Sequence, residues 1–153
     1  QSFTFYLCFM WGLKAYSIKK NKHYSGFRFR PFFRCREITI IFKFTDSCRY
    51  VSDDPQLTEQ INKLVGFGAL WHHRSSVRIG WRYSAKKDRI KLYTYKYIQG
   101  VRIQKHFDTV KIGQFNKLRI KAHRTYWLGK FLFPYFGGKS PAPHDIKILL
   151  DFV

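Results

Sequence analysis

The sequence predicts an all-β fold, an antiparallel two-sheet β-sandwich resembling a jelly roll, with one short helix near residues 54–65; a closed barrel is the alternative. From residue 76 onward apolar and polar side chains alternate with a period of two, which is typical of strands with one buried face. Turn residues recur at short intervals, as in an antiparallel meander. Hydrophobic residues make up 45% of the 153 residues, enough for one domain with a real core.

The N-terminal half begins with an apolar extension, residues 1–13, which is a first strand, the remnant of a signal sequence, or upstream sequence ahead of Met10. It is too short to cross a bilayer, and we expect no transmembrane segment elsewhere. Residues 14–153 are expected to form a single β-sandwich domain. Its first strands are predicted near residues 14–19, 26–30 and 36–45.

The one predicted helix follows these strands. Ser52, Asp53 and Asp54 are N-cap candidates and Pro55 suits a first helical turn, while Gly66 can end the helix. The expected apolar stripe of this helix consists of Leu57, Ile61, Leu64 and Val65. The alternating pattern of the C-terminal half then predicts strands near 77–83, 90–97, 101–104, 110–112, 117–122, 126–133 and 146–152.

The three cysteines, Cys8, Cys35 and Cys48, allow at most one disulfide, and Cys35–Cys48 is the favoured pair. We expect free buried thiols instead, because a chain of this length can hold a core without disulfides. Cysteine usage therefore does not decide the compartment; an extracellular or secreted location is favoured over a cytoplasmic one. The sequence does not determine the oligomeric state.

The charge is strongly positive, with 29 Lys and Arg against 9 acids and a net charge of +20. Such an excess predicts a polyanionic partner: an acidic glycan, nucleic acid or an anionic membrane surface. The alternatives are an organism with generally basic proteins or burial in a large assembly. The chain carries no Walker-type phosphate loop and no nucleophile elbow, and we expect no cofactor and no metal.

The main candidate binding face occupies the alternating positions opposite the apolar ones. Between residues 77 and 123 there are thirteen Lys or Arg and only two acids. Tyrosines can stack on sugar rings or bases, while Arg and Lys bind carboxylate, sulfate or phosphate. If the strands are neighbours, this face contains Arg78, Arg82, Lys91, Tyr93, Tyr95, Tyr97, Arg102, Gln104, Lys117, Arg119 and Lys121. The alternative is a solvated face whose tyrosines cover lysine stems.

The stretch HHRSSVRIGWR, residues 72–82, has three interpretations. The first is a strand that begins after a loop containing the histidines, with Trp81 in the core beside Val77 and Ile79. The second is a contact with the ligand. The third is catalysis by a polysaccharide lyase, in which His72, His73, Arg78 and Tyr93 would transfer protons and neutralise a carboxylate. A metal site is disfavoured, even with His144 and Asp145, because adjacent histidines point to opposite sides of an extended chain.

Two loops allow further interpretations. PYFGGKSPAPHD, residues 134–145, is expected to be a shaped turn in which Asp145 hydrogen-bonds; the alternative is an anion cradle formed by backbone N–H groups at 137–139. Residues 19–36 combine Lys and Arg with aromatics, a composition that would suit nucleic-acid phosphates and bases, although no known nucleic-acid-binding signature occurs.

Residues 107–131, FDTVKIGQFNKLRIKAHRTYWLGKF, and 133–153, with a Gly-Gly loop and a final strand, resemble the concanavalin A-like lectin and glucanase group of jelly rolls. From about Tyr16 the chain also resembles small uncharacterised proteins of Bacteroidota, which implies no activity. The first resemblance implies carbohydrate binding. Glycoside hydrolysis is disfavoured because it needs a carboxylate pair, whereas Glu37 and Glu59, the two glutamates, are far apart in sequence.

The resulting prediction is a non-catalytic binding module for an acidic polysaccharide or a similar polyanion. A nucleic-acid-associated or structural assembly protein, such as a phage or ribonucleoprotein component, is the alternative, and a polysaccharide lyase is the second alternative.

Overall fold

The computed structural model describes residues 12–26 and 29–153, so Cys8, Met10 and most of the apolar extension lie outside the described residues. The strands are β1 (Lys14–Ile18), β2 (Phe29–Phe44), β3 (Asn62–Gly68), β4 (Ser76–Ser84), β5 (Arg89–Ile98), β6 (Val101–Val110), β7 (Asn116–Leu132) and β8 (Ile146–Phe152). A 3-10 turn, η1 (Asp46–Cys48), and a helix, α1 (Pro55–Glu59), connect β2 to β3.

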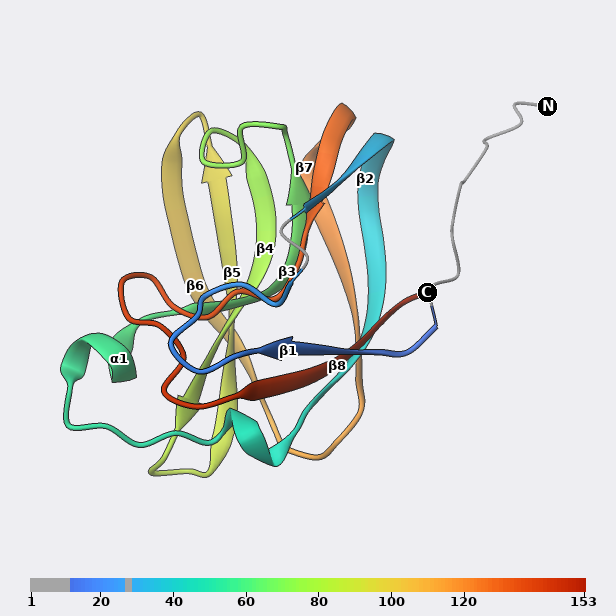
Figure 1. Ribbon diagram of the computed structural model, residues 1–153. Helices are drawn as coiled ribbons and strands as arrows, with labels where there is room; N and C mark the ends of the chain where they lie inside the picture. Colours follow the sequence, from blue (N-terminus) through green and yellow to red (C-terminus); the bar gives the residue numbers. More distant parts are fainter. Residues whose placement is uncertain (1–11, 27–28) are drawn as a thin grey trace.

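The strands form one eight-stranded antiparallel sheet in the order β1-β8-β2-β7-β3-β4-β5-β6. This confirms the predicted antiparallel β architecture but does not confirm two packed sheets. The sheet is open and strongly curved, so that β1 and β8 cross in front of the other strands (Figure 1). Phe44 of β2 reaches Trp81 of β4 at a ring-centroid distance of 5.1 Å, although β7 and β3 lie between these strands.

The core fills the inside of this curve. Its largest fully buried side chains are aromatic and come from β2, β3, β4, β7 and the segment after β7: Trp81, Tyr126, Phe42, Phe44, Phe67 and Phe136. Burying each such side chain contributes about 1.5–3 kcal/mol. Trp81 therefore lies in the core, as its alternation with Val77 and Ile79 predicted.

Two long strands carry the bend. The strands predicted near 26–30 and 36–45 are one strand, β2, and those near 117–122 and 126–133 are one strand, β7. Their register shifts between Cys35 and Glu37, and Arg34 next to this irregularity has a positive φ of 56°. Such a bulge increases local twist and bends the ribbon. The bent β2–β7 corner projects at the top of the molecule (Figure 1).

The predicted helix over 54–65 is wrong in its second half. Asp54 caps the helix by accepting from the Gln56 amide, but α1 ends at Glu59. Residues 62–68 instead form β3, which pairs with β4 on one side and β7 on the other. All seven β3 residues are buried, so the strand lacks alternation and its apolar residues imitate a helical stripe.

Cys35 and Cys48 are not joined to each other, so the favoured disulfide pair does not form. Cys48 is buried and Cys35 half-buried, and burial raises the pKa of the Cys48 thiol to about 12. Within the described ranges there is no helix long and apolar enough to cross a membrane.

Candidate functional site

Strands β3, β4 and β5 place a set of side chains on one face of the sheet. Gly66 of β3 pairs with Arg78 of β4, which pairs with Tyr95 of β5. One step along, Ser76 pairs with Gly68 and with Tyr97. Directly opposed residues on neighbouring strands point to the same face. Arg78, Tyr95 and Tyr97 therefore share one face, as the alternation of the sequence predicted.

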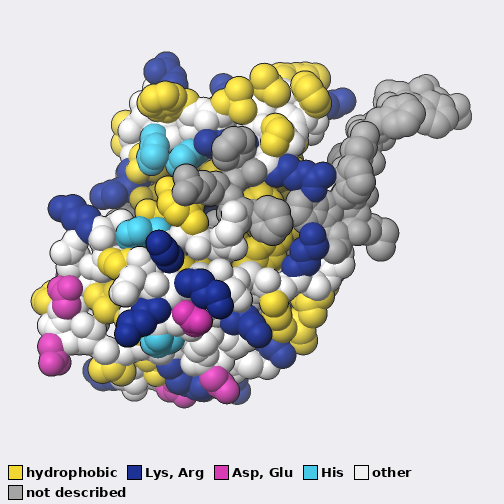
Figure 2. Space-filling model, viewed as in Figure 1, with side chains coloured by type: hydrophobic (Ala, Val, Ile, Leu, Met, Phe, Trp, Pro, Cys, Tyr) yellow, Lys and Arg dark blue, Asp and Glu magenta, His cyan; other side chains and the backbone are white. Residues whose placement is uncertain are grey.

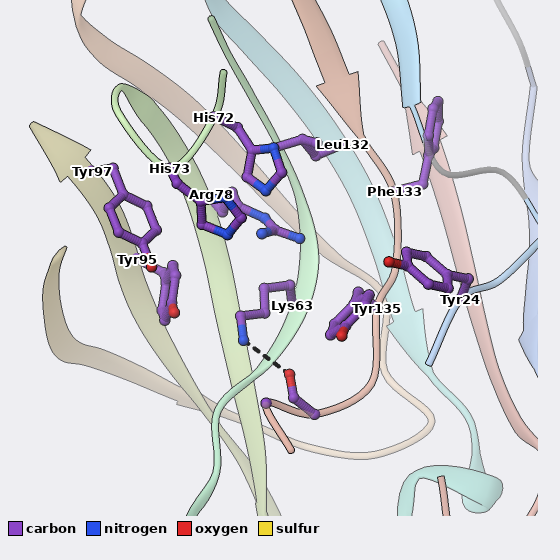
Figure 3. Close-up of a pocket in the computed structure, with 12 residues that line it drawn as sticks. Tyr24, Lys63, His72, His73, Arg78, Tyr95, Tyr97, Leu132, Phe133 and Tyr135 are labelled. Atoms are coloured by element: carbon purple, nitrogen blue, oxygen red, sulfur yellow. Dashed lines mark hydrogen bonds between the residues drawn. The ribbon is translucent and has the colours of Figure 1, made fainter. Parts of the chain in front are cut away.

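Two glycines in β3 leave no room for a side chain against β4. A Cβ atom on Gly66 would lie 2.2 Å from the Val77 carbonyl oxygen and 2.6 Å from the Arg78 Cα. On Gly68 it would lie 2.5 Å from the Ser76 Cβ. These short distances show that β3 lies close against β4, and a cavity of about 290 Å³ opens on the same side of the sheet as Arg78 (Figure 3). The cavity is lined by Tyr24, Lys63, His72, His73, Arg78, Tyr95, Tyr97, Leu132, Phe133, Tyr135, Gly137 and Gly138.

Segments from both ends of the chain form one wall. Tyr135 follows β7 and exchanges two backbone hydrogen bonds with Lys63, of 2.8 and 3.0 Å. Tyr24 forms a β-bridge with Tyr135, and their rings meet edge to face at 5.0 Å. This wall brings two tyrosines and a lysine to the cavity that the sequence did not mark as site residues.

Arg78 is the central charged group of the cavity (Figure 3). Its residue exposure is 8%, and its Nε has no hydrogen-bond partner among the residues that the structure describes. None of the described lining residues is acidic. Burial lowers the pKa of the guanidinium to about 10. A buried charge without a partner costs several kcal/mol, on the order of the desolvation penalty of one ion, so this site favours an anion.

Lys63 places a second buried basic group, an amine, in the same cavity. Its Nζ donates to the Gly137 carbonyl at 2.9 Å and lies 4.7 Å from the centroid of the Tyr95 ring. Burial, and then the charges of Arg78 and Arg102, lower the pKa of Lys63 to about 7. Near neutral pH this amine is therefore divided between its charged and neutral forms.

His72 and His73 lie in the loop before β4, as the strand-start interpretation predicted. They do not point to opposite sides, because the chain turns here: their rings are 4.1 Å apart and both line the cavity. Burial, followed by the charge of Arg78, lowers the pKa of both, that of His72 to about 3. Both imidazoles are therefore neutral near pH 7.

The residues raised as metal ligands do not converge. The His144 ring nitrogen lies 2.6 Å from the Ser47 carbonyl oxygen, and Asp145 accepts from the Lys20 amide at 2.8 Å. The part of the chain that the structure describes contains no group of three His, Cys, Asp or Glu side chains able to hold a metal ion.

Five predicted site residues continue the same face outside the cavity. Arg102 and Gln104 of β6 are exposed and pair with Tyr97 and Tyr95. Tyr93 is buried beneath Arg82, whose guanidinium carbon lies 5.4 Å from the ring centroid, and Arg82 pairs with Lys91. These side chains extend a cationic, tyrosine-bearing surface from the cavity toward the sheet edge.

Lys117, Arg119 and Lys121 do not extend that surface directly. The expected neighbours β6 and β7 are not paired, because β6 forms the sheet edge and β7 lies between β2 and β3. The three residues pair with β2, and Arg119 Nε lies 3.8 Å from a Glu37 carboxylate oxygen.

The Gly-Gly loop does not offer its amides to an anion. The Gly137 amide donates to the buried Asn62 Oδ1 at 2.7 Å, and the Gly138 and Ser140 amides donate to Gln60 Oε1. The loop is thus a shaped turn held by side chains beside β3, in agreement with the structural interpretation of this segment. Asp145, however, hydrogen-bonds outside the turn.

The comparisons with known proteins assign no family. No protein-family model matches the chain, and no curated protein matches it significantly in sequence. The inference of function therefore depends on the cavity and the surface around it.

Proposed function

We propose that this protein is a non-catalytic binding module whose cavity holds the anionic group of an acidic carbohydrate. The buried Arg78, accompanied by Lys63 and by no acid among the described lining residues, supports this proposal above all. A carboxylate or sulfate can accept two parallel hydrogen bonds from an arginine, and these charge-assisted bonds are stronger in a site shielded from water.

The tyrosines support a sugar as the body of the ligand. Tyr95 and Tyr97 form one wall, with ring centroids 5.9 Å apart, and Tyr24 and Tyr135 form another. Aromatic rings bury apolar area while their hydroxyl groups remain available for hydrogen bonds. At about 290 Å³ the cavity lies near the lower limit of small-molecule pockets, which suits one sugar ring carrying one anionic group. We further propose that the curved sheet is related to the sandwich of concanavalin A-like jelly rolls. That resemblance also favours a carbohydrate ligand.

Calorimetric titration with sodium glucuronate and with glucose tests the proposal, because these sugars are similar in size and differ in charge. We expect glucuronate to bind at physiological salt at least about ten times more tightly than glucose, a difference of about 1.4 kcal/mol. Tyr97→Leu, at a half-buried position, should weaken the binding. Equal binding of both sugars, or no binding of either, would contradict the proposal.

A single-stranded RNA serves as the comparison for the nucleic-acid alternative. Binding that falls steeply with salt and is unaffected by glucuronate would indicate only the basic surface. Binding of RNA at physiological salt that displaces glucuronate would favour the nucleic-acid-associated protein instead.

The proximity of both histidines to Arg78 favours one second candidate, a polysaccharide lyase. Arg78 would neutralise the uronate carboxylate while His72 or His73 moved a proton. Tyr93 does not line the cavity; Tyr95 and Tyr97 do. A lyase would cleave polyuronate and release unsaturated uronates, which absorb ultraviolet light. The double variant His72→Ala/His73→Ala should produce no such increase in absorbance. No absorbance change with the native protein would exclude this candidate for the polymers tested.

A further inference from the structure

One end of the molecule exposes an unusual set of large apolar side chains, here called the apolar end. The exposed fractions of its members are 86% for Phe33, 75% for Trp71, 68% for Trp127, 51% for Leu70 and 50% for Leu128. Single exposed apolar residues are common, but several gathered together mark a surface that binds a partner or a membrane.

The members of the apolar end are neighbours in the fold. Phe33 pairs directly with Leu128 at the bent corner of β2 and β7. Gly68 pairs with Lys130, so the chain leaves β3 beside this corner and continues into the loop with Leu70 and Trp71. The corner and the loop after β3 lie together at the top of Figure 1, where apolar side chains gather in Figure 2.

The apolar end is strongly cationic. Residues 30–36, 69–75 and 122–132 contain no acid, whereas they contain the basic residues Arg30, Arg34, Arg36, Arg74, Arg124 and Lys130. The Arg34 guanidinium carbon lies 5.1 Å from the centroid of the Trp127 ring, so an exposed aromatic and a charge share one site. In the view of Figure 2 the acids gather in the lower half, away from this end. The resulting asymmetry orients the molecule in the field of a negative surface.

We propose that the apolar end docks onto a lipid bilayer that contains anionic lipids, with Phe33, Trp71 and Trp127 in the headgroup region and the arginines at the lipid phosphates. Basic residues around aromatic and leucine side chains are the composition of surfaces that bind bilayer interfaces. This docking is independent of the proposed sugar site.

Two other occupants fit less well. A second copy of the chain would bring two equally cationic surfaces together, and like charges across an interface are repulsive. A nucleic acid would satisfy the arginines and stack on Trp71 or Trp127, but it offers no apolar interior for Leu70 and Leu128. An anionic bilayer satisfies both the charges and the leucines.

Flotation of the full chain with vesicles tests the proposal. One set of vesicles is phosphatidylcholine, and the other is phosphatidylcholine mixed with phosphatidylserine. We expect at least tenfold stronger partitioning to the serine-containing vesicles, with a blue shift of tryptophan fluorescence, because Trp71 and Trp127 leave water. Phe33→Ser/Trp71→Ser should reduce this partitioning at least tenfold, and added glucuronate should not change it.

The matched control is Val51→Ser/Phe115→Ser, which removes two exposed apolar side chains, 80% and 50% exposed, away from the apolar end. It should partition like the native protein, and melting temperatures should show that both variants are folded. The proposal is overturned if the serine-containing vesicles bind no protein, or if Phe33→Ser/Trp71→Ser binds as well as the control. The proposal is also overturned if light scattering shows that the native protein and the control variant are dimers while Phe33→Ser/Trp71→Ser is a monomer, because the apolar end would then be a dimer interface.

Discussion

Replacing Arg78 by methionine should stabilise the unliganded protein and remove most of its affinity for anions. Methionine keeps an unbranched side chain but lacks the guanidinium. Folding buries Arg78 to a residue exposure of 8% and leaves its Nε without a hydrogen bond among the described residues. None of the described residues around the cavity supplies a carboxylate to compensate the charge.

The size of both effects follows from this environment. Replacing buried ionic groups by apolar residues of similar volume is often neutral or stabilises proteins by about 1–4 kcal/mol, and the lack of an ionic partner for Arg78 favours a gain. A hydrogen bond to a charged group contributes about 1.5–3 kcal/mol. At about 1.4 kcal/mol per factor of ten, losing such a bond weakens the Kd of an anion roughly 10- to 100-fold.

Urea unfolding and calorimetric titration with glucuronate measure the two effects separately. Arg119→Met is the control because it removes the same formal charge from a side chain that is 69% exposed. It should leave glucuronate binding nearly unchanged. The reasoning is refuted if Arg78→Met is clearly less stable than the native protein and binds glucuronate as well as Arg119→Met does.

Three further changes test the surroundings of the cavity. Lys63 has a folded pKa of about 7 against 10.5 in the unfolded chain, so between these pH values the unfolded chain binds the extra proton. The urea midpoint of the free protein should therefore rise with pH across this window, while glucuronate affinity falls as Lys63 loses its charge. Gly66→Ala places a Cβ 2.2 Å from the Val77 carbonyl oxygen and should lower stability by about 1–3 kcal/mol in urea unfolding. Asn62→Ala leaves the Gly137 amide without its acceptor and should cost about 1–3 kcal/mol, with faster hydrogen exchange in the Gly-Gly loop.

Each of these changes has a control. Lys63→Met should remove the rise of the urea midpoint with pH, and an unchanged pH profile would place the titration on another group. Gly138→Ala meets no atom within 4 Å and should be neutral, so equal losses at Gly66 and Gly138 would contradict the steric explanation. If Asn62→Ala were as stable as the native protein, the Gly137 amide would be satisfied by another acceptor.

Alternation along β4 and β5 made half of the site predictable. Because both strands have one apolar face, their other positions could be assigned to a common face, and Arg78, Tyr95 and Tyr97 do lie together. The assumption that sequential strands are neighbours failed at β7, whose partners β2 and β3 come much earlier in the chain. Lys117 and Arg119 were therefore grouped with a face that they do not join.

The other half of the site was hidden by burial. Lys63 lies in β3, whose residues are buried on both faces, so its sequence shows no period of two and was interpreted as helix. Gly66 was interpreted as the end of that helix, whereas it lies inside β3, where a Cβ would clash with β4. Tyr24 and Tyr135 reach the cavity through a bridge between distant segments, which no local pattern reveals.

The order of strands in the sheet has a consequence for how the protein folds during synthesis. The hairpins that carry Arg78 and Tyr95 are local, and they can form while the rest of the chain is still being synthesised. The wall that carries Tyr24 and Tyr135 can form only after β7 has been synthesised and has paired with β2. Until then the Arg78 guanidinium stays in water. Because its burial depends on contacts between segments far apart in the chain, an anion that occupies the closed cavity would favour folding of newly made chains as well as stabilise the finished protein, and it would raise the yield of folded protein.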